Sequence, residues 1–190
     1  MELPPLAADV LAFWFGAPPL APRAEWFRKD AAFDNAVRDR FGVAVAAACA
    51  GAYGEWCASP QGALARIILL DQFTRNVHRG TAAAFSGDAR ALATADDAVA
   101  RGFDGALAPI ERQFLYLPFE HAEDAAMQAR SLALFGALAD ETGLASPLEW
   151  AQKHADIIRR FGRYPHRNAL LGRASTPDEI AYLETPGAGF

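Results

Sequence analysis

The chain reads PQGALARIILLDQFTRN from Pro60 to Asn76. When this segment is placed on a helix of 3.6 residues per turn, its apolar side chains cover most of the circumference. A helix that is apolar on all sides is normally surrounded by other helices. We therefore expect residues 60–76 to form the central helix of an all-α fold.

Capping signals predict further helices on both sides of this segment. Ser146-Pro147-Leu148-Glu149 places serine at an N-cap, proline at the first helical position and glutamate at the third, and Thr176-Pro177-Asp178-Glu179 repeats the pattern. Glycines 16, 51, 102 and 162 are expected to end helices. The predicted helices are roughly Ala7–Gly16, Ala31–Ala50, Pro60–Asn76, Asp88–Arg101, Pro109–Phe119, Glu123–Glu141, Pro147–Phe161 and Pro177–Glu184.

The spacing of these helices predicts how they are arranged. No segment alternates apolar and polar residues between turns as a strand does. The connections are short, so neighbouring helices should pack antiparallel. The 190 residues suit one domain. We predict a single all-α domain over residues 1–190, with its core at about residues 7–184.

Composition excludes several classes of protein. The net charge of −5 argues against general binding of nucleic acids, which needs a cationic surface. Cys49 and Cys57 form no CxxC pair, so a zinc site built on thiolates is not expected. The longest aliphatic run, Ile67–Leu70, is far too short to span a membrane. No signal peptide is visible, and we expect a cytoplasmic protein.

Polar residues lie near the C-terminal end of the predicted central helix. Asp71 and Arg75 are four residues apart on an otherwise apolar stripe, so they can form an ion pair. Asn76 follows directly. The three residues are candidates for ligand binding. The alternative is a structural ion pair at the end of the helix, because a charge in the core is tolerated when it is paired.

Two further segments supply candidates for acid–base chemistry. Pro118 is expected to kink or end its helix, which leaves Glu120 and His121 at a helix junction. His154 lies on an apolar stripe with Trp150 and Ile158. Glu120, His121 and His154 are therefore the candidate catalytic residues. The alternatives are that Glu120 and His121 brace two helix ends and that His154 is a satisfied core histidine.

Arginines concentrate near the C-terminal end. Between His154 and Arg173 there are five arginines and one acid, Asp156, which gives a local charge of +4 when histidine is counted as neutral. Such a cluster suits a carboxylate or phosphate. The candidate ligand-binding residues of this segment are Arg163, His166, Arg167, Asn168 and Arg173. The alternative is that each arginine pairs with an acid elsewhere in the chain.

No metal or other cofactor is predicted from these residues. A di-iron helical bundle needs repeated Glu-x-x-His motifs, and none occurs. Glu120, His121, Glu123 and His154 could form a mixed site, but their spacing is not diagnostic of one. Nucleotide-binding glycine motifs are also missing from the sequence.

Four of these stretches together resemble a known family. They are LAFWFG from Leu11, IILLDQFTRNVHRG from Ile67, ERQFLYLPFEHAED from Glu111 and HADIIRRFGRYPHRNALLGRAST from His154. They are similar to the bacterial domain of unknown function 924 family, over roughly Val10 to Leu183. Members often carry proline or serine where Thr74 stands and serine where Ala122 stands. The resemblance implies an all-helical fold similar to tetratricopeptide repeats and no settled activity.

Three functions are compatible with these features. The first is a polar pocket between helices for a small anionic ligand, either as a binding site or as the active site of an enzyme. The second is a module that binds peptides through a concave helical surface, with Trp14, Phe15, Trp26 and Phe27 as its exposed aromatic residues. The third is a buried polar network that only fixes helix packing. Convergence of the polar residues on one pocket would favour the first function.

Overall fold

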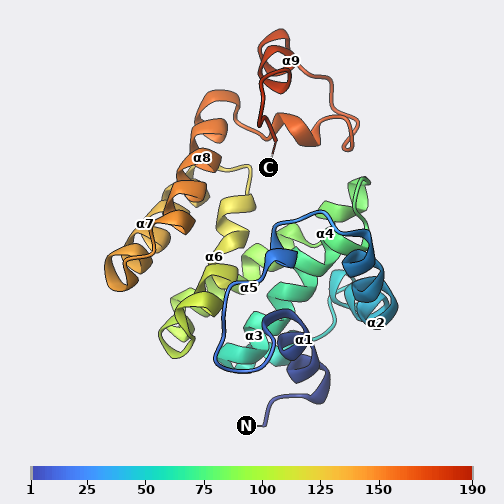
Figure 1. The fold of residues 1–190 in the computed structure, drawn as a ribbon, viewed down its shortest axis with the longest axis vertical. Coiled ribbons are helices and arrows are strands. Elements are labelled where there is room, and N and C mark those ends of the chain that lie inside the picture. The colour runs from blue at the N-terminus through green and yellow to red at the C-terminus, as the bar shows by residue number, and fades with distance from the viewer. Residues whose placement is uncertain (1, 190) are drawn as a thin grey trace. The chain divides into compact units, whose positions relative to one another are not determined.

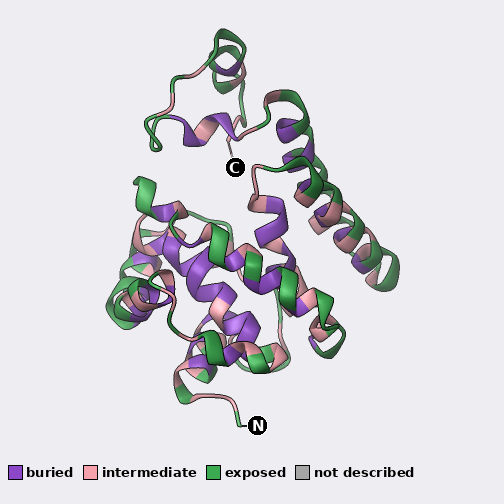
Figure 2. Ribbon diagram, turned by 180° about the vertical axis from the view of Figure 1, so that it is seen from behind, coloured by how far each residue is buried: buried purple, intermediate pink, exposed green. Residues whose placement is uncertain are grey.

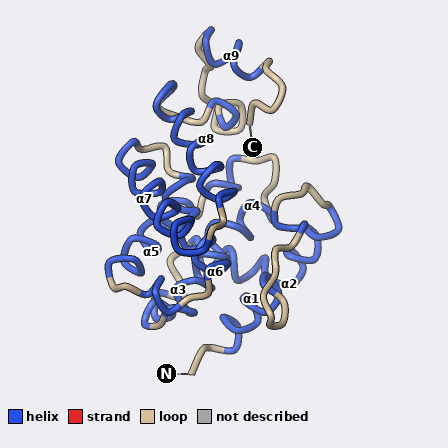
Figure 3. Tube along the Cα trace, turned by 60° about the vertical axis from the view of Figure 1, so that its left-hand side comes forward, coloured by secondary structure: helices blue, strands red, loops and turns tan. Residues whose placement is uncertain are grey.

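The computed structural model describes residues 2–189, and within that range the regular structure is helical, without strands (Figure 3). The all-α prediction is therefore confirmed. The α-helices are α1 (Pro5–Phe15), α2 (Ala31–Cys49), α3 (Pro60–Ile67), α4 (Thr74–Val77), α5 (Asp88–Ala100), α6 (Pro109–His121), α7 (Ala125–Thr142), α8 (Ala145–Phe161) and α9 (Pro177–Leu183). Short 3₁₀ turns cover Ala24–Trp26, Gly54–Ala58, Ala82–Phe85, Phe103–Ala106 and Pro165–Arg167.

The chain folds into two compact units (Figure 1). The first unit contains the residues up to Arg79 together with Ala83–Pro118, and the second contains Gly80–Ala82 and the residues from Phe119 onward. A single domain and a tetratricopeptide-like arrangement stay predictions. Among the described residues, no helix is long and apolar enough to cross a membrane.

The predicted central helix is the core of the first unit. It is formed by α3, the six-residue segment η3 (Ile68–Phe73) and α4, which follow one another without a break. Helices α1, α2 and α5 pack against it. Leu64, Ile67 and Leu70 are completely buried, and Figure 2 shows this segment in purple along most of its length.

The middle of this helix departs from the predicted α-helical geometry. Residues Ile68–Phe73 form a π-helix, in which the backbone N–H of Thr74 donates to the carbonyl of Leu69, five residues earlier. The Thr74 hydroxyl donates to the same carbonyl at 2.9 Å. The widened turn shifts the register of every residue after it. Apolar periodicity alone does not reveal such an insertion, because all sides of the segment are buried.

Gly87 makes the tightest packing contact with the π-helical turn. It precedes α5, and a Cβ atom added to it would lie 2.1 Å from the carbonyl oxygen of Leu70. Backbone atoms cannot move aside as a flexible side chain can. The close approach of α5 to η3 therefore requires glycine at this position.

In the second unit, α7 and α8 form an antiparallel hairpin joined at Gly143 and Leu144 (Figure 1). Gly143 ends α7 at a positive φ of 74°. Helix α8 begins at Ala145, so the predicted N-cap at Ser146 is wrong, and no side chain caps that helix. The predicted capping box of α9 between Thr176 and Glu179 is confirmed.

The helix containing Pro118 extends further than expected. Helix α6 was predicted to end at Phe119, but it continues to His121 with Pro118 inside it. A proline removes only its own N–H donor from the helix. Helix α7 begins at Ala125 with Asp124 as N-cap, so the predicted placement of Glu123 in its first turn is wrong.

Substitution of Gly87 by alanine should destabilise the first unit by about 1–3 kcal/mol, the usual cost of overpacking. Urea unfolding of the purified chain measures this loss. Gly42→Ala in α2 is the matched control, because a Cβ there would meet only the Arg38 side chain at an ordinary 3.9 Å. Equal stability of the two variants would contradict the close approach of α5 to η3.

Candidate functional site

The predicted site residues fall into the two units of the chain. Asp71, Arg75 and Asn76 belong to the first unit. The candidates from Glu120 onward belong to the second unit: Glu120, His121, His154, Arg163, His166, Arg167, Asn168 and Arg173. Each group is therefore considered within its own unit.

Arg75 joins two helices in the first unit. Its Nη1 lies 2.9 Å from Oδ1 of Asp71 and 2.9 Å from Oδ1 of Asp88, the first residue of α5. The same nitrogen donates to the backbone carbonyl of Asp71 at 2.7 Å. Asp71 is completely buried, whereas the Arg75 side chain is about one-fifth exposed. The predicted pair is present, and its three contacts favour the structural interpretation.

Asn76 belongs to a neighbouring structural contact. Its Nδ2 donates to Oδ1 of Asp34 in α2 at 2.7 Å, and Arg79 donates to both oxygens of Asp34 at 2.6 and 2.8 Å. Burial raises the pKa of Asp34, but the hydrogen bonds from Arg79 and Asn76 outweigh it, so this pKa lies below its ordinary value. Sequence analysis missed Asp34, because nothing local distinguishes it from other acids near a helix start.

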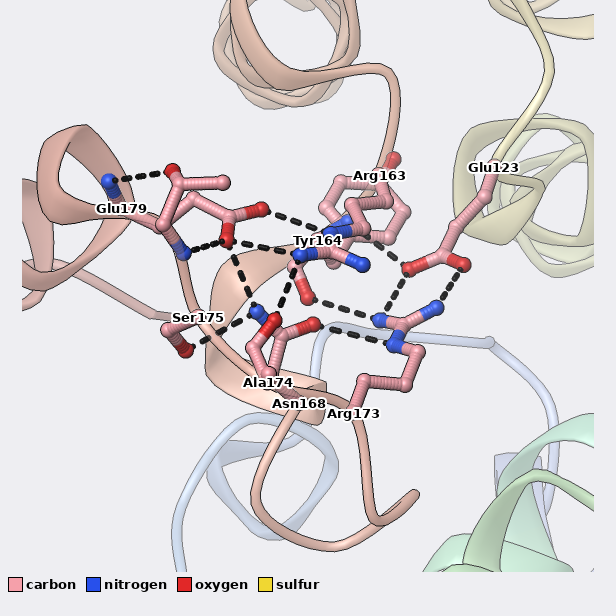
Figure 4. A network of polar contacts seen from close by, with 9 residues as sticks. Glu123, Arg163, Tyr164, Asn168, Arg173, Ala174, Ser175 and Glu179 are labelled. Atoms are coloured by element: carbon pink, nitrogen blue, oxygen red, sulfur yellow. Dashed lines mark hydrogen bonds and ion pairs between the residues drawn. The ribbon is translucent and has the colours of Figure 1, made fainter.

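In the second unit, Glu123 is surrounded by donors (Figure 4). Arg173 donates to both of its oxygens, at 2.6 and 2.9 Å, and the backbone N–H of Tyr164 donates to Oε1 at 2.7 Å. Burial raises the pKa of Glu123, and the hydrogen bond from Arg173 more than compensates, so the pKa is lowered. Glu123 therefore anchors the loop that follows α8 instead of capping α7.

A second acid of this unit, Glu179, is bound by a different arginine, Arg163 (Figure 4). Arg163 donates to its two oxygens at 2.6 and 2.8 Å, and Asn168 donates to Oε2 at 3.2 Å. Arg173 in turn donates to Oδ1 of Asn168 at 2.9 Å. The hydrogen bond from Arg163 lowers the pKa of Glu179 to about 2. Arg163, Asn168 and Arg173 thus bind acids of the chain itself, as the alternative interpretation expected.

A hollow of about 400 Å³ lies beside this network. It is lined by Arg160, Phe161, Arg163, Thr176, Asp178 and Glu179. Arg163 is the one predicted ligand-binding residue in this lining. Its charge is matched there by Glu179, so the hollow does not concentrate positive charge.

The three candidate catalytic residues come together. We call Glu120, His121 and His154 the histidine centre. Nδ1 of His154, in the middle of α8, lies 3.0 Å from Oε1 of Glu120 at the end of α6. The rings of His121 and His154 are 6.2 Å apart between centroids. Glu120 and His154 are buried and His121 is half-buried.

The hydrogen bonds of His154 determine which ring nitrogen carries a proton. Nδ1 also lies 2.9 Å from the backbone carbonyl of Trp150. A carbonyl oxygen can only accept, so Nδ1 must be the protonated nitrogen and Nε2 carries the lone pair in the neutral ring. Burial lowers the pKa of His154 to about 3, and the nearby His121 contributes to the same shift. His154 is therefore neutral at physiological pH.

Tyr164 organises the surroundings of the histidine centre. Its hydroxyl donates to the backbone carbonyl of Glu120, and its ring meets His154 edge-on at 5.6 Å between centroids. His166 and Arg167 lie against the same ring, at 5.6 and 4.6 Å from its centroid. Of the predicted ligand-binding residues, His166 and Arg167 are thus the two that gather with His154.

Gln128 of α7 completes this arrangement. Its Nε2 donates to the carbonyls of Glu120 and Ala122, each at 2.8 Å, and lies 3.0 Å from the Tyr164 hydroxyl. These contacts satisfy carbonyl groups at the C-terminal end of α6. Sequence analysis missed Gln128 and Tyr164, because their role depends on how α6, α7 and the loop after α8 meet.

The chain is similar to other proteins of unknown function. A family described as "Bacterial protein of unknown function (DUF924)" matches residues 10–187. A solved structure, titled as a protein of unknown function, ATU0120, from Agrobacterium tumefaciens, is 46% identical. Its TM-score is 0.85, with 94% of this chain and 97% of that chain covered. The search of curated proteins gave no match.

Removal of Arg75 should leave the buried Asp71 without its cation. We expect Arg75→Ala to cost about 3 kcal/mol of unfolding free energy, the usual loss when one partner of a buried ion pair is removed. Chemical denaturation measures it. Arg40→Ala, which breaks an exposed pair with Asp9, is the control and should cost less than about 1 kcal/mol. A loss for Arg75→Ala no larger than that of the control would disprove a stabilising role for the pair.

The pair of Arg163 and Glu179 predicts an acid-sensitive contribution to stability. The Glu179 pKa is lowered from 4.5 to about 2 in the folded protein, so the contribution is present above pH 4.5 and is lost as the pH falls toward 2. Arg163→Gln should reduce this loss, as seen by comparing unfolding curves across that range. Arg159→Gln, which breaks an exposed pair with Asp156, should leave the pH dependence unchanged. Parallel curves for Arg163→Gln and the wild type would refute the linkage.

Proposed function

The chain belongs to the DUF924 family of bacterial proteins of unknown function, and we propose that it binds a small anionic ligand beside the histidine centre. The ligand class is a phosphate or carboxylate group. The observation that carries the proposal is the gathering of donor side chains around Tyr164 and the buried His154. His166 and Arg167 lie against the ring of Tyr164, at 5.6 and 4.6 Å from its centroid, and the rings of His121 and His154 are 6.2 Å apart.

Donor groups of this kind favour an anion. A guanidinium offers planar N–H donors that match carboxylate and phosphate oxygens. Arg167 is buried, so its charge is screened less by water than that of an exposed arginine. His121 and His166 are half-buried and can add imidazole N–H donors. These donors gather at one place within the second unit.

The contacts of Arg163 and Arg173 explain how the loop that carries Arg167 is positioned. Arg163 binds both oxygens of Glu179, and Arg173 binds both oxygens of Glu123. These contacts keep the loop from Gly162 to Arg173 against α9 and against the turn between α6 and α7. That loop carries His166 and Arg167. In the proposal, Arg163 and Arg173 hold the loop in place, and Arg167 with the histidines contacts the ligand. A catalytic role for Glu120, His121 and His154 stays a prediction.

Peptide binding has weaker support. Trp14 and Phe15 are buried, and Trp26 packs against Trp14 and Phe114 at centroid distances of 6.0 and 4.7 Å. Phe27 is the one member of the predicted aromatic set that is largely exposed. A single exposed ring does not make a peptide groove.

Titration with inorganic phosphate, sulfate and succinate tests the proposal. Calorimetry in buffer containing EDTA should show saturable binding of at least one of them, and the NMR signals of the histidine side chains in the second unit should shift. Arg167→Gln should weaken binding at least tenfold because it removes the buried charge. Arg159→Gln, at an exposed position of α8, is the control and should bind as the wild type does.

The absence of saturable binding of all three anions to the wild-type chain would refute the proposal. Unchanged affinity in a folded Arg167→Gln variant would refute the assigned position. If Arg167→Gln does not fold, His166→Ala replaces it, with the same expected weakening and the same control.

A further inference from the structure

We propose that Glu120, His121 and His154 form a binding site for one divalent transition-metal ion, with zinc as the best match, and that the anion binds as a further ligand of this ion. The second clause rests on the proposed function, whereas the metal site itself does not. The spacing of these residues along the sequence did not predict a metal, and the inference comes from their placement in the fold.

The geometry suits a single ion. One ligand atom from each of the three residues lies within 4.8 Å of the other two. Three atoms this close share a centre no more than about 2.8 Å from each, and zinc binds imidazole nitrogen and carboxylate oxygen at about 2.0–2.2 Å. Side-chain adjustments of less than about 1 Å would therefore bring all three atoms to coordination distance.

The donor set indicates the class of metal. Two imidazoles and one carboxylate are the ligands of a well-known class of catalytic zinc sites, which keep a fourth position open for water or substrate. Imidazole donors also suit copper, nickel and iron, whereas magnesium and calcium prefer sites made of oxygen. Glu120, His121 and His154 thus match a borderline transition metal better than a hard cation.

The hydrogen bonds of His154 orient it as metal-binding histidines are usually oriented. A ligating histidine typically donates its other ring N–H to a backbone carbonyl or a carboxylate. Nδ1 of His154 lies 2.9 Å from the carbonyl of Trp150, which can accept its proton. Nε2 is then the nitrogen available to an ion.

The helix ends around the site are held firmly. Tyr164 and Gln128 bind the backbone carbonyl of Glu120, the second of these contacts at 2.8 Å. Glu120 and His121 are the last two residues of α6, so these bonds restrain the part of the backbone that carries both side chains. A restrained backbone lowers the entropic cost of gathering three ligands around an ion.

The surrounding charges connect the ion to the anion. Glu120 is buried, where water screens its attraction for a divalent cation only weakly. Arg167 is a positive charge in the same neighbourhood, because it lies against the ring of Tyr164, which also meets His154. An anion that bridges the ion and Arg167 neutralises both, so metal and anion should strengthen each other's binding. This coupling is reciprocal by thermodynamic linkage.

The test uses the tag-free full-length chain, stripped with EDTA and then dialysed. Calorimetry with Zn²⁺ should give one ion per chain, and Co²⁺ should give the visible absorption of a four- or five-coordinate site. His121→Ala and Glu120→Gln should each weaken binding at least tenfold. His78→Ala is the matched control, because His78 belongs to the first unit, and it should bind like the wild type. Circular dichroism verifies that each variant is folded.

Several results would overturn the metal site. They are a wild-type stoichiometry well below one, a featureless Co²⁺ spectrum, or equal losses in His78→Ala and His121→Ala. Succinate should alter the Co²⁺ spectrum, and an unchanged spectrum would overturn the role of the anion as a ligand of the ion. Anion binding that persists in EDTA while Zn²⁺ does not bind refutes the metal site alone. Stoichiometric Zn²⁺ binding without any anion binding refutes the proposed function alone.

Discussion

A carboxylate removed from water must receive a cation or several hydrogen bonds, and the polar architecture of both units follows from this requirement. Asp71 is matched by Arg75, Asp34 by Arg79, Glu123 by Arg173 and Glu179 by Arg163. Three of these pairs join residues from different elements of the chain. Asp71 and Arg75 are four residues apart in one helix, but Arg75 also contacts Asp88 of α5. The arginines therefore act first as connectors between elements.

The surroundings of Glu120 include histidines, which those of the other buried acids described above do not. Oε1 of Glu120 lies 3.0 Å from Nδ1 of His154, and a ligand atom of His121 lies within 4.8 Å of both residues. Imidazole and carboxylate groups are ligands of borderline transition metals, whereas a guanidinium is not. The residue types therefore distinguish the histidine centre from the ion pairs between arginines and acids.

The local geometry of the first unit shows how packing overrides helical periodicity. The π-helical turn at Ile68–Phe73 lies between two α-helical segments and contacts α2 and α5. Thr74 supplies a hydroxyl to the Leu69 carbonyl, and Gly87 allows α5 to approach the Leu70 carbonyl. Such turns widen a helix at a cost, which neighbouring contacts must offset. The contacts from α2 and α5 supply that compensation.

The amino-acid sequence by itself determined the helical class, most helix positions, the central place of residues 60–76 and the pairing of Asp71 with Arg75. These features are local, because apolar periodicity and capping residues act within a few turns of chain. Only the tertiary structure decided the partners of Asp34, Glu123 and Glu179, the roles of Gln128 and Tyr164, and the meeting of Glu120 and His121 with His154. The residues of each such contact are far apart along the chain, by 33 positions between His121 and His154. Spacing cannot predict which of many arginines reaches which acid, because that choice depends on how whole helices pack.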